Sequence, residues 1–571
     1  MSVSKKLILL AFLSSSLLIS KPVDKNTTKE PSQSKKVTQK AKISSSIWVK
    51  NSSLTPLGEE LIDQMKKDKT ISYDLPFYKA YKKTLKDIKR GKVTNKEMNK
   101  LYYDYMNYLI RGGINWSAFK RDINRLKKKY DYSVGWETTP PPYSAKKILN
   151  NAILNGSFNN IFQKVEPRRF KYPQMKKYLI KYIDIRNNGG LPMPGKTPTL
   201  KVGSSHPGIK KIKKQLKLLG DLSNSCPTNT VYDKCMIKAV KRFKIRHGLK
   251  GTSIINRATR RELNTPISTQ IRKIRLNMDR IKWVRRSEPR VRIEINIPAF
   301  RLYVYDGKDL VTTMRIVAGK PDHPTPVFSD TLTTVVVNPY WRIPESILRK
   351  EMLKKLIKNP HYYEKQGKYL YKGWGANAKK VNPAKVNWKQ YLNNKKPIPY
   401  HFMQEPGHNN ALGRIKFLFP NKYAVYIHDT PSKRLFFRES RAYSHGCMRI
   451  QKPRELLKAL ALYNDNINVN KVMRKLGTTD NTAIGLTRKI PIDIVYLTSF
   501  VDDYGNLHFR RDIYGYDRLQ LKHYYRLASA KPVAKKAKKT KTKTKTKKKE
   551  PKKKATKKVA SKDPNIIEIG Y

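Results

Sequence analysis

The sequence predicts a multidomain α+β protein, with a helical N-terminal half and a mainly β C-terminal half. With 571 residues the chain is too long for one ordinary hydrophobic core, so we expect two to four domains. Apolar residues and tyrosines recur three and four positions apart between Thr55 and about Arg186, which is the helical period. At Val291 the period changes to two, which is typical of half-buried strands.

The first helical domain is predicted over residues 55–200. The segments Tyr78–Lys89 and Asn95–Ile110 carry apolar residues on one helical face, and the tyrosine stripe around Tyr102 and Tyr105 is interpreted as part of the core. A Gly- and Pro-rich stretch after Asn188 ends this region.

A second helical unit is predicted over residues 201–266. Ile209, Ile212 and Leu216 share one face of its first helix, a second helix follows, and a third runs from Asn256 to Leu263. A further helix over residues 267–290 is expected to return to the first helical domain.

The β domain is predicted over residues 291–526. Strands follow one another with short turns, such as Asp306-Gly307, and this pattern predicts a mixed or antiparallel β-sandwich. A Lys-, Tyr- and Asn-rich insert with helical patches interrupts the strands at residues 345–400.

The stretch from Tyr423 to Ile450 carries the clearest chemical pattern. An alternating segment predicts a strand that ends at His428, and sixteen residues later comes Ser444-His445-Gly446-Cys447. A thiol of ordinary pKa is mostly protonated at neutral pH, so a nucleophilic Cys447 needs a base nearby, and His428 and His445 are the two candidates. Gly446 permits a tight turn whose backbone N–H groups can face an oxyanion.

This pattern resembles the motif of the L,D-transpeptidases with a YkuD-type catalytic domain. The local sequences H-D-T-P and S-R-A-Y-S-H-G-C-M-R resemble the large, multidomain periplasmic branch, the YcbB-like enzymes. The resemblance extends over roughly Thr55 to Arg526. It implies that residues 55–200 are a scaffold domain and that the insert caps the active site. Residues 201–266 resemble a three-helix peptidoglycan-binding module, although Gly251–Asn256 departs from it, and a spacer bundle is the alternative.

The resemblance implies a cysteine-dependent L,D-transpeptidase that forms 3→3 peptidoglycan cross-links through a thioester. Cys447 would be the nucleophile and His428 the general acid and base, whereas His445 and Gly446 would shape the turn and the oxyanion site. Arg449 would bind a substrate carboxylate or form an ordinary ion pair. The remaining expected substrate-binding residues are Tyr426, Trp341 and Ser444.

Two other functions stay open from the sequence. An L,D-carboxypeptidase would use water as the acceptor at the same site, and a non-catalytic basic protein would only bind the envelope. No metal and no cofactor are expected, because the sequence contains no H-x-x-x-H and no C-x-x-C.

The two ends of the chain predict export and an anionic partner. Residues 1–20 read as a signal peptide, with an uncleaved anchor as the alternative, and residues 21–54 read as a flexible linker. We therefore expect a periplasmic or cell-envelope protein. In such an oxidising compartment Cys226 and Cys235 are a candidate disulfide, with two reduced cysteines as the alternative.

The net charge of +80 indicates anionic partners. Residues 527–571 form a Lys-rich tail that cannot bury a core, and it is expected to be disordered. The tail is predicted to bind anionic envelope polymers or a membrane surface. Its lysine-rich stretch has no aromatic residue for base stacking, and an exported enzyme rarely meets DNA, so nucleic acid is not an expected partner.

Overall fold

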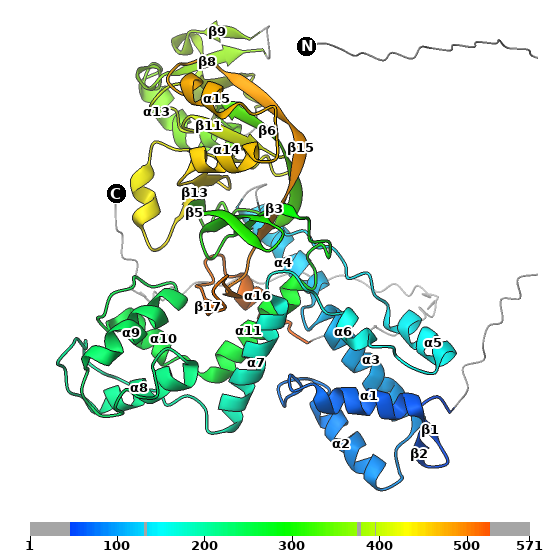
Figure 1. The fold of residues 1–571 in the computed structure, drawn as a ribbon. Helices are drawn as coiled ribbons and strands as arrows, with labels where there is room; N and C mark the ends of the chain where they lie inside the picture. The colour runs from blue at the N-terminus through cyan, green and yellow to red at the C-terminus, as the bar shows by residue number, and fades with distance from the viewer. Residues whose placement is uncertain (1–45, 131–133, 374–377, 394–395, 526–571) are drawn as a thin grey trace, which may run out of the picture.

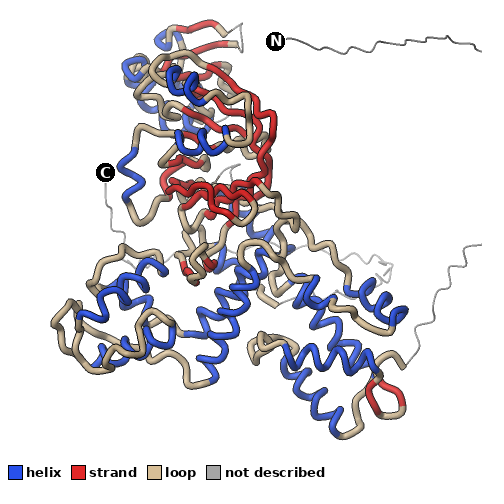
Figure 2. The backbone as a smooth tube through the Cα atoms, in the orientation of Figure 1, coloured by secondary structure: helices blue, strands red, loops and turns tan. Residues whose placement is uncertain are grey.

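The computed structural model describes residues 46–130, 134–373, 378–393 and 396–525, and Figure 1 shows their arrangement. The predicted signal peptide, most of the linker and the whole Lys-rich tail lie outside these ranges. Most strands gather in the upper part of the molecule together with a few helices, and most of the helices lie below them (Figure 2). This organisation confirms the predicted multidomain α+β class.

The N-terminal region begins with a short hairpin and continues as helices around an aromatic core. Tyr102 and Tyr105 are fully buried there, as their spacing predicts, and they pack with Trp48 and Phe158. Thr94 and Glu97 form a capping box that fixes the start of the third helix. The elements are β1 (Val49–Lys50), β2 (Ser53–Leu54), α1 (Pro56–Lys67), α2 (Tyr78–Lys89), α3 (Asn95–Arg111), α4 (Trp116–Lys129), α5 (Ala145–Asn155), α6 (Ile161–Lys164) and α7 (Tyr172–Asn187).

The second helical unit contains α8 (Pro207–Leu219), α9 (Lys234–Arg246) and α10 (Arg257–Leu263). A disulfide joins Cys226, in the loop between α8 and α9, to Cys235 in the first turn of α9. The helices share one hydrophobic cluster with α7, with α11 (Ile267–Ile281) and with the hairpin of β16 (Ser499–Val501) and β17 (Leu507–Phe509). This unit therefore packs against the rest of the protein on its inner side.

Helix α11 connects the helical and β regions through buried charges. On one side Arg275 pairs with Asp74 at 2.8 Å, and on the other Arg280 pairs with Asp517 at 2.8 Å. Breaking a buried pair leaves an uncompensated charge, so these contacts disfavour separation of the two regions.

The β domain is built on a nine-stranded sheet. Its strand order is β13-β5-β14-β12-β11-β6-β15-β3-β4, and β4 also pairs with β5. That additional pairing closes the sheet into a barrel, so the predicted sandwich is wrong in this respect. The strands are β3 (Val291–Asn296), β4 (Arg301–Asp306), β5 (Asp309–Gly319), β6 (Phe328–Val337), β11 (Ile415–Leu418), β12 (Ile427–His428), β13 (Ala442–Ser444), β14 (Met448–Ile450) and β15 (Thr482–Val495).

Helices and one 3₁₀ turn complete the β domain. The turn η6 (Lys433–Phe437) lies between β12 and β13, and α14 (Pro453–Ala461), α15 (Val469–Lys475) and α16 (Tyr516–Lys522) follow β14. Leu456, Leu457 and Leu460 of α14 enter the same hydrophobic core as the barrel strands. The apolar face of this helix therefore packs onto the barrel.

The strand predicted over Tyr423–His428 is shorter in the structure. It covers Ile427 and His428 alone, because the chain turns before it. The Asn421 side chain accepts hydrogen bonds from the N–H groups of Tyr423 and Val425, and Ala424 adopts a left-handed backbone conformation with φ of 51°. His428 still stands at the end of the strand, as predicted.

The insert folds around a hydrophobic core of its own, in which Leu356, Trp388 and Phe402 are buried. Its four-stranded sheet has the order β7-β10-β8-β9 and reaches from Trp341 to Gln404. Its elements are β7 (Trp341–Arg342), α12 (Glu345–Ile347), the π-helix η1 (Leu348–Met352), α13 (Leu353–Lys358), η2 (Glu364–Gln366), β8 (Lys368–Lys372), β9 (Lys379–Val381), η4 (Pro383–Lys385), η5 (Trp388–Tyr391) and β10 (Tyr400–Gln404).

In the part of the chain that the structure describes, no helix combines the length and the apolar character that crossing a membrane requires.

Candidate active site

The catalytic residues expected from the sequence lie on or beside neighbouring strands of the barrel. Strand β12 carries His428, and β14 runs parallel beside it with Arg449 opposite His428. On the other side β11 runs antiparallel and places Lys416 opposite His428. Cys447 lies directly before β14, at the end of the turn that begins at Ser444.

These residues line a cavity of about 760 Å³ between the barrel and the insert. The walls include nearly all of the predicted site residues, namely Trp341, Tyr426, His428, Ser444, His445, Cys447 and Arg449. Gly446 does not line the cavity, whereas the predicted disulfide pair lies in the second helical unit. The cavity is large enough for a peptide substrate.

His428 is buried and Cys447 is half-buried. Burial raises the pKa of the Cys447 thiol, although hydrogen bonding with Tyr426 and the charges of Lys416 and Arg449 act in the opposite direction. Burial and the neighbouring Arg449 lower the pKa of His428 to about 3. Both groups are therefore neutral at pH 7, which leaves His428 able to accept a proton.

The His428 ring is held by the backbone. Its Nδ1 lies 2.5 Å from the carbonyl oxygen of Asp429, so this nitrogen carries the proton and Nε2 is the basic one. Among the described residues, no hydrogen bond joins Cys447 to His428. Catalytic hydrogen bonds are often long in unliganded structures and tighten when substrate binds.

The turn before Cys447 is fixed by hydrogen bonds within it. The Ser444 hydroxyl donates to the Cys447 carbonyl at 2.5 Å and accepts from the Gly446 N–H at 3.3 Å. Gly446 has φ of 111°, a region that favours glycine. The N–H groups of His445 and Cys447 make no hydrogen bond within the described residues, so both are available as donors.

Behind the turn lies a polar network that the sequence analysis missed. Thr325 donates through Oγ1 to the Gly446 carbonyl at 2.8 Å and accepts from the Gly319 N–H at 2.9 Å. The Tyr514 hydroxyl donates to the Gly319 carbonyl at 2.7 Å and accepts from the Thr325 N–H at 3.2 Å. No local motif marks Thr325 or Tyr514, because both act from more than sixty residues away.

The insert contacts the turn directly. Glu351, in its π-helix, lies 2.7 Å from Nε2 of His445, and the His445 ring stacks on His323 with centroids 4.5 Å apart. Burial lowers the pKa of His445, and the Glu351 carboxylate opposes this effect. His445 thus joins the insert to the turn, and its ring is already in contact with Glu351 and His323.

Arg449 faces the cavity without a counterion. No carboxylate of the described residues pairs with it, and its buried Nε has no hydrogen-bond partner. Burial accordingly lowers the pKa of its guanidinium. An ion pair, one of the two expected roles of Arg449, is therefore absent from the described part of the chain.

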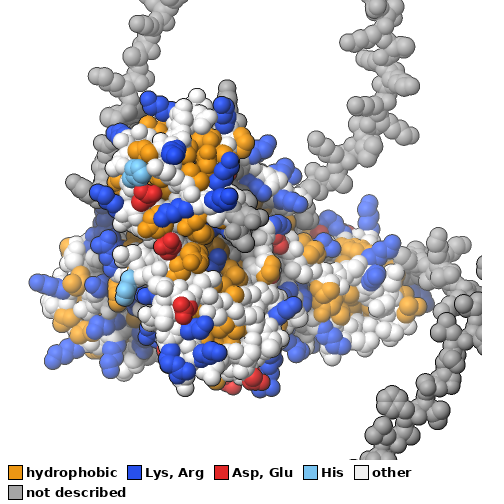
Figure 3. Space-filling view, turned by 90° about the horizontal axis from the view of Figure 1, so that it is seen from above, with side chains coloured by type: hydrophobic (Ala, Val, Ile, Leu, Met, Phe, Trp, Pro, Cys, Tyr) orange, Lys and Arg blue, Asp and Glu red, His pale blue; other side chains and the backbone are white. Residues whose placement is uncertain are grey.

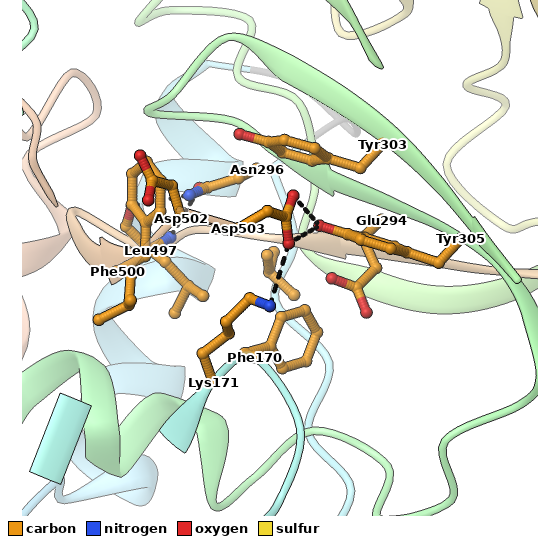
Figure 4. A pocket seen from close by; sticks show the side chains of 12 residues that line it. Phe170, Lys171, Glu294, Asn296, Tyr303, Tyr305, Leu497, Phe500, Asp502 and Asp503 are labelled. Carbon is orange, nitrogen blue, oxygen red and sulfur yellow. Dashed lines mark hydrogen bonds and ion pairs between the residues drawn. The ribbon is translucent and has the colours of Figure 1, made fainter. Parts of the chain in front are cut away.

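A smaller cavity of about 50 Å³ lies beneath the barrel, between β3, β4, the start of α7 and the β16–β17 hairpin. Figure 4 shows Lys171, Tyr305 and Asp503 pointing toward one another in it. Asp503 accepts a hydrogen bond from the Tyr305 hydroxyl at 3.1 Å and pairs with Lys171 at 3.0 Å. These groups satisfy one another and join three elements, so they read as a structural contact.

Comparisons with known proteins agree with the position of the cavity. Residues 290–479 match the YkuD family of L,D-transpeptidase catalytic domains, and residues 41–179 match a scaffold domain. A Haemophilus influenzae protein, whose curated name assigns it provisionally to the L,D-transpeptidases, is 33% identical over 226 residues. This segment is 40% of the present chain and 44% of that protein, so less than half of the relative's length is matched.

Solved structures of the same class are more distant. An L,D-transpeptidase of Stackebrandtia nassauensis has 12% identity and a TM-score of 0.21, covering 52% of this chain and 97% of that one. An L,D-transpeptidase from Mycobacterium smegmatis has 12% identity and a TM-score of 0.16, covering 36% of this chain and 58% of that one. Residues 290–479 are therefore similar to L,D-transpeptidase catalytic domains of the YkuD family, and residues 41–179, which precede them, are similar to a scaffold domain.

Proposed function

We propose that the protein is a cysteine-dependent L,D-transpeptidase that forms 3→3 cross-links between peptidoglycan stem peptides. The observation that carries this proposal is the shared cavity of Cys447 and His428 inside the matched domain. A half-buried thiol, a neutral imidazole and free backbone N–H groups in one place are what acyl transfer through a thioester needs.

In the first half of the reaction Cys447 attacks the carbonyl carbon of the third residue of a tetrapeptide stem. The Sγ–H proton passes to Nε2 of His428 as the S–C bond forms, and the carbonyl oxygen becomes an oxyanion facing the N–H groups of His445 and Cys447. The intermediate then collapses, the C–N bond breaks, and the imidazolium returns its proton to the leaving amine. D-alanine departs and a thioester remains.

In the second half an amine of a neighbouring stem attacks the thioester. His428 takes the proton of the attacking amine as the C–N bond forms, and it delivers that proton to the sulfur when the S–C bond breaks. The enzyme returns to its starting state, and the two stems are joined through their third residues.

The rest of the chain is proposed to hold the enzyme at the cell wall. Figure 3 shows Lys and Arg side chains scattered over the face seen from above, with fewer acidic ones, in keeping with the net charge of +80. Such a surface favours anionic envelope polymers. We further propose export to the periplasm or cell envelope, with residues 201–266 acting as a peptidoglycan-binding-like domain or as a spacer.

Product analysis tests the proposed reaction. Incubation with purified tetrapeptide stems is expected to give free D-alanine together with dimers linked between third residues, identified by fragmentation in mass spectrometry. Tripeptides without dimers would instead identify an L,D-carboxypeptidase that uses water as the acceptor. Release of no D-alanine by the intact protein would favour a non-catalytic envelope-binding protein.

A further inference from the structure

Lys416 is a charged residue of the cavity wall to which the mechanism above gives no role. In β11 the alternation of the strand turns Ile415 and Phe417 into the barrel core, which leaves Lys416 on the opposite face. Its side chain lines the cavity beside Tyr426, with Nζ 4.0 Å from the centre of that ring.

The ammonium group of Lys416 has no anionic partner. Within the described residues it forms no ion pair, and burial lowers its pKa, as does the cation Arg342, whereas the Cys447 thiol raises it. With Arg342 and Arg449 it gives this part of the wall three cations that face one cavity. A half-buried, unpaired ammonium is costly, and a bound anion would remove that cost.

The order of the strands indicates which anion of the substrate would reach it. His428 and Lys416 belong to β12 and β11, and Cys447 lies directly before β14 on the other side of β12, so the backbones of Cys447 and Lys416 stand on the order of 10 Å apart. The leaving amine must lie at His428 to receive its proton. When the leaving amino acid is the last residue of the stem, its carboxylate carbon lies two bonds beyond the leaving amine. The carboxylate then stands about 5 Å from the sulfur, and we place it on the side of Lys416.

We propose that Lys416 is a specificity-determining residue, which binds the C-terminal carboxylate of the leaving amino acid and so selects stems that end at that residue. The inference rests on the proposed function, because the proposed mechanism is what places the leaving amine at His428. It gives Lys416 a role that Arg449, on the far side of His428, does not fill. A stem extended by another residue, or one with a neutral end, would leave the ammonium unpaired and bind more weakly.

Binding measured without turnover tests the proposal. The protein with Cys447→Ala is titrated calorimetrically with a tetrapeptide ending in D-alanine and with the same peptide as its C-terminal carboxamide. We expect the acid to bind about 10- to 100-fold more tightly, as for a hydrogen bond between charged groups. Adding Lys416→Met is expected to abolish that difference, whereas adding Lys489→Met, an exposed lysine of β15, is expected to leave it unchanged.

The opposing outcomes are distinct. If the doubly substituted protein with Lys416→Met keeps the full preference for the acid, the carboxylate binds elsewhere and the proposal is overturned. Equal affinity for the two peptides before Lys416 is changed, or no affinity for either, also overturns it.

A second readout separates the role of Lys416 from an effect on the thiol. With Cys447 present, the rate of alkylation by neutral iodoacetamide reports thiol reactivity alone. We expect Lys416→Met to raise KM for the acid substrate about tenfold or more while this rate changes less than about twofold. If Lys416→Met slowed alkylation and the turnover of both peptides to the same extent, Lys416 would act on the reactivity of the Cys447 thiol, and the proposal would be overturned. If instead the proposed reaction is wrong, the protein with Cys447 present would give no dimers and no free D-alanine, while the preference for the acid peptide in binding would remain.

Discussion

Burial moves the proton affinities of Cys447 and His428 in opposite directions. It raises the pKa of the thiol and lowers that of the imidazole to about 3, so the resting pair is uncharged. The charges needed for attack then arise together, when substrate fills the cavity and excludes the remaining water. A buried imidazole also links the stability of the β domain to pH.

We expect the free energy of unfolding to fall as the pH decreases from 6.5, the ordinary pKa of His428, toward about 3. In this interval the unfolded chain binds a proton at His428 and the folded chain does not, so acid favours unfolding. The contribution of His428 is on the order of 4 kcal/mol over the interval and is fully present above pH 6.5. Urea denaturation at a series of pH values, with His428→Gln for comparison, measures it. Identical pH slopes for the two proteins would contradict the burial of a neutral His428.

Thr325 determines the shape of the catalytic turn from behind. The substitution Thr325→Val keeps the size of this buried side chain but leaves the Gly446 carbonyl and the Gly319 N–H unpaired. We expect a loss of about 1–3 kcal/mol in stability and a lower kcat, because the oxyanion donors follow the turn. Thr331→Val in β6 is the matched control, since the hydroxyl of Thr331 makes no hydrogen bond within the described residues. Equal effects of the two substitutions would rule out a positioning role for Thr325.

The insert contacts the barrel through Glu351 and His445, and the pKa of His445 reports on this contact. Replacing Glu351 by Gln removes the carboxylate that raises the pKa of His445, so we expect this pKa to fall further below its ordinary value. The ion pair is partly exposed, and its loss should change stability by less than about 1 kcal/mol. NMR titration of His445 measures the shift. An unchanged titration would mean that the insert stands away from the turn in solution.

Arg246, at the end of α9, joins the three-helix unit to the β16–β17 hairpin and also pairs with Asp221 inside the unit. Arg246 bonds to Asp221 through Nε at 2.9 Å and to the carbonyl of Leu507 in the β16–β17 hairpin at 2.8 Å. We expect Arg246→Ala to destabilise the protein by about 3 kcal/mol, because Asp221 is left buried and charged. The combined substitution Arg246→Met with Asp221→Asn should recover much of this loss in thermal or urea denaturation. A single substitution with no measurable effect would indicate that the unit is not held in this way.

Across the whole molecule, local patterns predicted more than distant contacts did. The spacing of Tyr102 and Tyr105 predicted a core face, and the motif around Cys447 predicted which residues would share a cavity. The closure of the barrel depends on the pairing of β4 with β5. No local sequence pattern shows whether such strands close a barrel or stay at the edge of a sandwich. Lys416 reads as an ordinary solvent-facing strand residue, and its position beside His428 depends on register. Thr325, Tyr514 and Glu351 reach the turn through tertiary folding alone.

The charge of the whole molecule leads to a prediction about retention at the wall. The stretch 531–562, outside the described residues, holds seventeen lysines and one glutamate and supplies about +16 of the +80. Truncation after Ala530 is expected to leave turnover of small soluble stems unchanged and to weaken salt-sensitive binding to sacculi or anionic vesicles only in part. Sedimentation with sacculi at several salt concentrations measures this. Equal binding with the same salt dependence in both proteins would mean that the tail does not contribute to retention at the wall.

The claim that Cys447 is the acylated residue can be tested by one measurement on the full-length protein. Intact mass after exposure to a carbapenem, which mimics the D-alanine end of an acyl donor, is expected to increase by one drug molecule, with the adduct on the peptide that contains Cys447. Cys447→Ala is expected to show no adduct and to form no dimers, while its circular dichroism is unchanged. An adduct that persists in the Cys447→Ala protein, or 3→3 dimers formed by it, would contradict the account.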